Sequence, residues 1–184
     1  MKLAIVVGHN ARRQGAIRPD TGEYEFTWNS GLAEMIEDEA RLFPQIQVKT
    51  FFRKDCGNYR REIESVYHDV DAWGADASTE LHFNSHTSRK ATGTEVLSSG
   101  SKSSLRHAKA LQERLIDALG LRDRGVKIRA SGRGSESLIS GRAPATLIEP
   151  FFGSSPTGQA ATDEPHEKRA LALAILQATQ DAFL

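Results

Sequence analysis

Short β-branched runs alternate with longer helical patterns along almost the whole chain, and this alternation limits the folds open to it. Residues typical of strands fill the runs 3–7, 47–52, 79–83, 94–97, 125–129 and 145–149. Helical periodicity fills the segments 29–42, 58–73, 103–119 and 164–183. Polar loops rich in Gly, Ser, Thr, Arg and Pro occupy 10–24, 84–93, 98–104, 131–136 and 153–165. We therefore predict an α/β fold: a single domain with a twisted, mostly parallel sheet of about six strands and helices on both faces.

Length and charge exclude several classes of protein. The 184 residues leave room for one substantial core, and a single cysteine, Cys56, excludes a disulfide framework and a Cys-rich metal site. Lys plus Arg and Asp plus Glu each total 24, whereas a protein that binds nucleic acid by counterion release is clearly basic. The apolar run 3–7 is too short for a membrane span or a signal peptide. We expect no nucleic-acid partner, no stable membrane insertion, a monomer, and synthesis in the cytoplasm without a signal peptide.

Three side chains with catalytic or metal-binding chemistry lie at the carboxyl ends of predicted strands, where open α/β sheets place their sites. His9 follows the first strand, His82 lies near the end of the third, and Glu149 closes the last. A carboxylate at the end of so apolar a strand costs several kcal/mol if it is buried unpaired, so we expect Glu149 to face a cleft. Taken alone, His9 could be a loop hydrogen-bonding group and His82 a core imidazole.

Four motifs, taken in order, carry a resemblance to a known family: Val7-Gly8-His9-Asn10, Glu25-x-x-x-Asn29, Leu81-His82-Phe83-Asn84 and Leu147-Ile148-Glu149-Pro150-Phe151-Phe152. The series resembles the zinc-dependent N-acetylmuramoyl-L-alanine amidases of the amidase-3 type, found in cell-wall remodelling enzymes and phage endolysins. Secondary marks that also resemble the family are Arg53-Lys54-Asp55, Gly93-Thr94-Glu95-Val96 and Arg124-Gly125-Val126-Lys127. The first motif departs from the family's usual Asp-Pro-Gly-His-Gly, which bears on substrate fit more than on metal binding.

The resemblance implies one Zn²⁺ per chain, held by three protein ligands with a fourth position open. The implied ligands are His9, Glu25 and His82, and the implied catalytic residue is Glu149, acting as general base and then as general acid. Candidates for orienting the ligands or contacting substrate are Asn29, Asn84, Arg12 and Arg13. Composition leaves open whether Glu23 or Glu25 binds the metal, and the spacing to Asn29 favours Glu25.

The resemblance also implies the function: a bacteriolytic peptidoglycan hydrolase that cleaves the amide bond between N-acetylmuramic acid and L-alanine. Residues 1–184 would form a single catalytic amidase domain without a separate cell-wall-binding domain. We expect a phage-type endolysin that acts on the cell wall, in the periplasm, after its release from the cytoplasm.

Two alternatives stay open. The first is another zinc peptidase or an N-acyl amino acid hydrolase on a related fold, in which Arg124, Arg129 or Arg142 would hold a terminal carboxylate. The second is a cell-wall-binding module without catalysis.

Three further histidines fall in predicted helices and are expected at the surface: His68, His107 and His166.

Overall fold

The computed structural model describes residues 1–129, 131–132 and 134–184, so the expected loop 131–136 is described only in part. In chain order the elements are β1 (Lys2–Val7), α1 (Glu25–Glu39), a 3-10 turn (Ala40–Leu42), β2 (Gln47–Phe52), α2 (Tyr59–Trp73), β3 (Ala77–Leu81), β4 (Thr94–Ser98), α3 (Lys102–Leu119), β5 (Asp123–Ile128), α4 (Ser135–Ile139), β6 (Ala145–Glu149), α5 (Pro156–Ala160) and α6 (Pro165–Phe183). Strands and helices alternate as the sequence predicts, and the α/β fold is confirmed.

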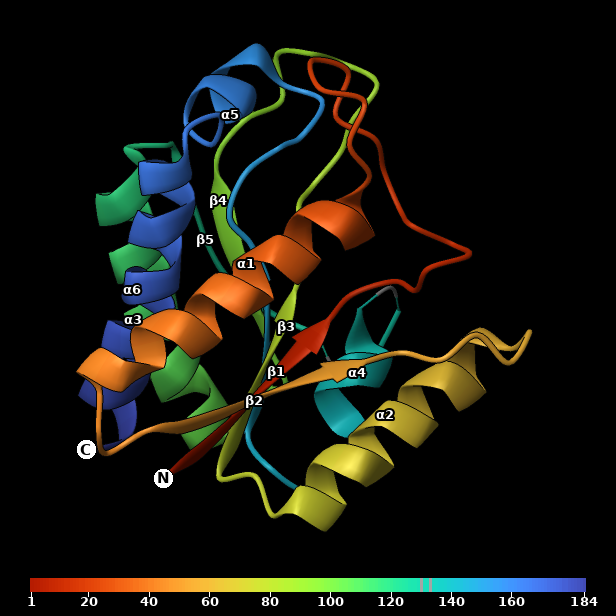
Figure 1. Ribbon diagram of the computed structural model, residues 1–184, viewed down its shortest axis with the longest axis vertical. Helices are drawn as coiled ribbons and strands as arrows, with labels where there is room; N and C mark the ends of the chain where they lie inside the picture. The colour runs from red at the N-terminus through yellow and green to blue at the C-terminus, as the bar shows by residue number, and fades with distance from the viewer. Residues whose placement is uncertain (130, 133) are drawn as a thin grey trace.

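The six strands form one twisted sheet in the order β2-β1-β3-β6-β4-β5 (Figure 1). Every neighbouring pair is parallel except β4 and β6, which run antiparallel. The carboxyl ends of β1, β3 and β6 therefore lie at the same edge of the sheet as the start of β4. This edge is where parallel sheets carry their sites.

Helices cover both faces of the sheet (Figure 1). On one face α1 packs over alternate side chains of β1, including Leu3, Ile5 and Val7, α3 packs over β4 and β5, and α6 packs against both helices. On the other face α2 packs over Ala4 and Val6. This division follows from the period of two in a strand, which sends successive side chains to opposite faces. Both faces of the central strands are thus buried, and β1 reads as a continuous apolar run, whereas β3 also buries Ser78, Thr79 and Glu80.

The elements at the sheet edge begin and end differently from the prediction. Helix α1 begins at Glu25, four residues before the predicted start, and an acid in the first turn interacts favourably with the helix dipole. Strand β3 spans residues 77–81 instead of 79–83, so His82 follows the strand. The short helix α5 lies within the predicted loop 153–165, and α4 begins within the predicted loop 131–136, because five residues are too few for a helical period to be recognised.

The predicted surface position of one helical histidine is wrong. His107 on α3 is completely buried, and its Nε2 lies 3.1 Å from the hydroxyl of Thr179 on α6. His68 and His166 are exposed as predicted. Among the described residues, no helix combines the length and the apolar character needed to cross a membrane.

Candidate active site

His9 follows β1 in a backbone conformation that few side chains adopt. Its φ is 66°, and it is the one non-glycine residue with positive φ among those the structure describes. This left-handed conformation is unfavourable for most L-residues and is concentrated at functional sites. Gly15 leaves the space that the ring needs, because a Cβ atom there would lie 2.6 Å from Nε2 of His9.

Glu25 is held by groups on both sides of its carboxylate. Oε1 lies 2.8 Å from Nδ1 of His82, and Oε2 lies 3.1 Å from Nε2 of His9. The backbone amides of Phe83 and Ala16 also donate to Oε1 and Oε2 respectively. Burial raises the pKa of this carboxyl, but the two histidines outweigh burial and hold the pKa far below its usual range. Glu25 is therefore an ionised carboxylate with a fixed orientation.

His82 lies between two carboxylates, one at each ring nitrogen. Nδ1 faces Glu25, and Nε2 lies 2.9 Å from Oε1 of Glu80. Burial lowers the pKa of the imidazole, but hydrogen bonds and charge from Glu25 and Glu80 outweigh burial and raise the pKa to about 10. The ring has no freedom to turn without breaking one of these bonds.

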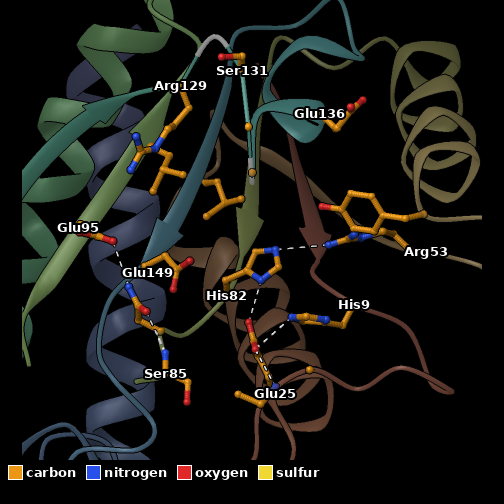
Figure 2. A pocket seen from close by; sticks show the side chains of 18 residues that line it. His9, Glu25, Arg53, His82, Ser85, Glu95, Arg129, Ser131, Glu136 and Glu149 are labelled. Atoms are coloured by element: carbon orange, nitrogen blue, oxygen red, sulfur yellow. Dashed lines mark hydrogen bonds and ion pairs between the residues drawn. The ribbon is translucent and has the colours of Figure 1, made fainter. Parts of the chain in front are cut away.

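His9, Glu25 and His82 can together hold a metal ion. One ligand atom from each residue lies within 4.8 Å of the others, and the three come from the ends of β1 and β3 and from the start of α1. Figure 2 shows the two imidazoles converging on the carboxylate of Glu25. Two imidazole nitrogens and a carboxylate oxygen form a donor set known from catalytic zinc sites, and the residues fit such an ion. Glu23 lies apart, on the lining of a second, smaller cavity.

Glu149 ends β6 next to the metal-capable cluster. In the sheet Leu81 pairs with Ile148, and the backbone amide of His82 donates to the carbonyl of Ile148 over 3.1 Å. Glu149 therefore stands beside His82 at the same edge. Its side chain is half-buried and lines the same cavity as the cluster (Figure 2).

The cavity over this edge has a volume of about 940 Å³, enough for a substantial part of a polymeric substrate. Its walls carry the cluster and Glu149 together with residues from α2, β4 and the segment after β5. Beyond the cluster and Glu149, its polar and charged lining residues are Arg53, Tyr59, Asn84, Ser85, Glu95, Arg129, Ser131 and Glu136.

The four residues predicted to orient the ligands or contact substrate lie in different surroundings, and one of them lines the cavity. Asn84 lines the cavity, but its amide donates to Glu95 over 3.0 Å. Asn29 is completely buried, and neither polar atom of its amide has a hydrogen-bond partner in the described part of the chain. Arg12 and Arg13 are exposed and pair with Asp55 and Glu62, outside the cavity lining.

Residues outside the predicted set of ligands, catalytic residue and substrate contacts also line the cavity. Glu95 pairs with Glu149 in the sheet and accepts from Nε of Arg124 over 2.9 Å. Tyr59 is half exposed, and Arg129 has no ion pair with any described residue. Arg53 and Glu95 belong to motifs that resemble the family, Arg129 is named only for the alternative peptidase, and Tyr59 carries no motif.

Comparison with known proteins gives a family and a fold. A sequence profile of the Amidase_3 family, described as N-acetylmuramoyl-L-alanine amidase, matches residues 3–181. No curated protein matches the chain.

Solved structures with the same fold cover nearly the whole chain. The catalytic domain of CwlV, an N-acetylmuramoyl-L-alanine amidase from Bacillus (Paenibacillus) polymyxa var. colistinus, has a TM-score of 0.82 at 22% identity, covering 98% of this chain and 97% of its own. The catalytic domain of the CD27L endolysin, which targets Clostridia difficile, has a TM-score of 0.83 at 23% identity, covering 100% and 99%. An N-acetylmuramoyl-L-alanine amidase from Clostridium difficile 630 has a TM-score of 0.83 at 22% identity, covering 97% and 94%.

Proposed function

The chain belongs to the N-acetylmuramoyl-L-alanine amidase family, and from this premise we propose that it hydrolyses peptidoglycan with one bound Zn²⁺. The bond cut is the amide between N-acetylmuramic acid and L-alanine. Residues 1–184 act as a single catalytic domain and as a monomer. The observation that carries the proposal is the cluster of His9, Glu25 and His82 in one cavity with Glu149.

In this proposal His9, Glu25 and His82 bind the metal. Nε2 of His9, Nδ1 of His82 and the carboxylate between them are the atoms that already face one another. When bound, Zn²⁺ supplies a Lewis acid that polarises the scissile carbonyl and makes water easier to deprotonate. The three ligands come from separate, hydrogen-bonded elements, and this keeps their relative positions fixed.

Glu149 moves the proton. Its carboxylate accepts a proton from the attacking water as the water oxygen bonds to the carbonyl carbon. It then gives that proton to the amide nitrogen as the C–N bond breaks, and the products are the lactyl carboxylic acid and a peptide with a free L-alanine amino group. One carboxylate serves both steps because it is regenerated at the end.

We also propose that the protein is lytic, as an endolysin is, and acts on the cell wall without a blocking element. Between His82 and Glu149, the described helices are α3 and α4. Helix α3 packs on α6 through residues such as His107, and the short α4 lies at the cavity rim, where Glu136 is part of the lining. Addition of the purified protein to bacteria with permeabilised outer layers should lower their turbidity, and unchanged turbidity would contradict the lytic role.

Arg129 favours one competing function. A carboxypeptidase needs a cation for the terminal carboxylate, and of three candidate arginines only Arg129 both lines the cavity and has no ion pair among the described residues. Arg124 pairs with Glu95 and Arg142 with Asp71. Digestion would then release a C-terminal amino acid.

Digestion of purified peptidoglycan tests the proposal. The protein is added as purified, with chelator, and with chelator followed by Zn²⁺, and the products are read by mass spectrometry. We expect zinc-dependent peptides that begin with L-alanine. Release of single C-terminal residues would establish a carboxypeptidase in place of the amidase. Zinc binding without any product would favour a cell-wall-binding module that has no catalytic activity.

A further inference from the structure

Glu80 is a carboxylate in the middle of the sheet. It lies in β3, between β1 and β6, and its side chain is completely buried. An ionised carboxylate in such a place costs several kcal/mol unless it is paired and hydrogen-bonded. Its side chain lies on the same side of the sheet as that of His82, because Nε2 of His82 lies 2.9 Å from Oε1 of Glu80.

Three groups from different elements satisfy this carboxylate. The Arg53 guanidinium, from the segment after β2, donates to Oε1 over 2.5 Å, and the Tyr67 hydroxyl on α2 donates to Oε2 over 3.0 Å. Nε2 of His82 lies 2.9 Å from Oε1. Arg53 is itself buried, so the ion pair is shielded from water. The carboxylate thus has a fixed position relative to the imidazole.

The two nitrogens of His82 have separate partners. Nδ1 faces Glu25 and the cluster with His9, and Nε2 faces Glu80. Arg53 also approaches Nε2, but at 3.4 Å, and its nitrogen lies closer to Glu80. A guanidinium can only donate, so the carboxylate is the group that can accept a hydrogen bond from Nε2–H. Metal-binding histidines commonly donate their second N–H to such an acceptor, which fixes the tautomer and the ring orientation.

We propose that Glu80, held by Arg53 and Tyr67, is a positioning residue for the metal: it accepts the hydrogen bond from Nε2–H of His82 and so leaves Nδ1 as the ligand atom. This inference rests on the proposed function, because it requires His82 to bind Zn²⁺. It assigns a role to a buried ion pair whose carboxylate, Glu80, is not part of the cavity lining. It also explains why β3, a strand in which every residue is buried, carries a charged residue at position 80.

Zinc affinity of Glu80→Gln, measured by competition with a chromophoric chelator, tests the proposal. Glutamine keeps the shape but weakens the acceptor, and we expect the affinity to fall by about 10- to 100-fold. The matched control is Glu39→Gln at the far end of α1, which also removes a buried, arginine-paired carboxylate, here bonded to Arg169 over 2.7 and 3.0 Å. Its zinc affinity should equal that of the wild type.

A second measurement does not depend on the folding of a variant. In zinc-loaded wild-type protein with ¹⁵N-labelled histidine, NMR should find the His82 proton on Nε2, strongly deshielded by the carboxylate. A proton on Nδ1 would overturn the inference, as would unchanged zinc affinity in a folded Glu80→Gln. Failure of the wild-type protein to bind Zn²⁺ is a different result, since it overturns the proposed function itself.

Discussion

Gly8 and the imidazole of His82 lie so close together that no side chain fits between them. A Cβ atom on Gly8 would lie 2.4 Å from Cε1 of His82 and 2.6 Å from the backbone carbonyl of Leu81. The amide of Gly8 donates to that same carbonyl over 3.0 Å, so the backbone cannot move aside without losing a bond. Glycine is required here by close approach, and the residue that follows it is His9.

Gly8→Ala should therefore damage the metal site. The added methyl group displaces the His82 ring or separates the two strands, and we expect zinc affinity to fall at least about tenfold. Chelator competition measures this. Gly31→Ala is the control: it lies inside α1, its nearest neighbour at 3.3 Å is the ammonium at the end of the long Lys168 side chain, and it should gain about 0.5–1 kcal/mol of stability. Wild-type zinc affinity in Gly8→Ala would contradict the argument.

Glu149→Gln should separate catalysis from metal binding. The amide cannot accept a proton from water, so peptidoglycan hydrolysis should fall by about 10²- to 10⁴-fold, the range for a lost general base. Because Glu149 is outside the ligand cluster, zinc content should stay at one ion per chain. Product formation and metal analysis on the same sample measure both quantities. Retained hydrolysis would remove the role proposed for Glu149.

His82→Ala should show the opposite pattern. Removal of one of three ligands should lower zinc content below stoichiometric, and hydrolysis should be lost with it. A His82→Ala protein that holds one Zn²⁺ per chain would exclude His82 as a ligand. Read together with Glu149→Gln, the result distinguishes a ligand from a proton carrier at neighbouring positions of the sheet edge.

Zinc should stabilise the folded chain by mass action, since the ligands converge only after β1, β3 and α1 have assembled. The free energy of unfolding should rise by about 2.7 kcal/mol when free zinc reaches 100 times its Kd. Denaturant titrations at several buffered zinc concentrations measure the rise. The Glu25→Gln protein, which lacks the carboxylate ligand, should show a much smaller dependence, and an equal dependence would place the stabilising ion elsewhere.

The sheet edge that carries the site was predictable from the sequence, and the buried contacts were not. His9, His82 and Glu149 each lie at or just after the end of a strand, so parallel topology alone brings them to one edge. Glu25 entered through the family resemblance, and its role as a ligand stays a prediction. Glu80 could not be found, because its partners Arg53 and Tyr67 lie 27 and 13 positions away and meet it only in the fold.

The antiparallel direction of β4 has a signal in the sequence. Parallel neighbours need a crossover connection, usually a helix. The predicted loop 84–93 contains none, so the chain reverses direction between β3 and β4. Strand β4 then pairs with β6 in the antiparallel sense and brings Glu95 opposite Glu149. Its place in the sheet depends on long-range packing that no local pattern encodes.

His107 should make stability depend on pH. Burial, and to a smaller extent the charge of Arg106, lowers the pKa of its imidazole to about 3, so the ring is neutral in the fold. In the unfolded chain it titrates near 6.5. Above that pH both states are neutral and the group contributes nothing. As the pH falls from 6.5 towards 3, only the unfolded state binds the proton, and the free energy of unfolding falls by about 1.4 kcal/mol per unit.

His107→Gln removes this titration and keeps a group that can hydrogen-bond to Thr179. Urea denaturation of both proteins at pH 7 and pH 5 measures the contribution of His107 to the pH dependence of the free energy of unfolding. The contributions of the carboxylates are the same in both proteins and cancel in the comparison. The variant is less stable at pH 7 because the buried ring against Phe183 is lost. Between pH 7 and pH 5, however, the wild type should lose roughly 2 kcal/mol more than the variant. Equal losses would show that the α3–α6 interface opens enough to admit a proton, and would contradict the claim that His107 stays neutral in the folded protein.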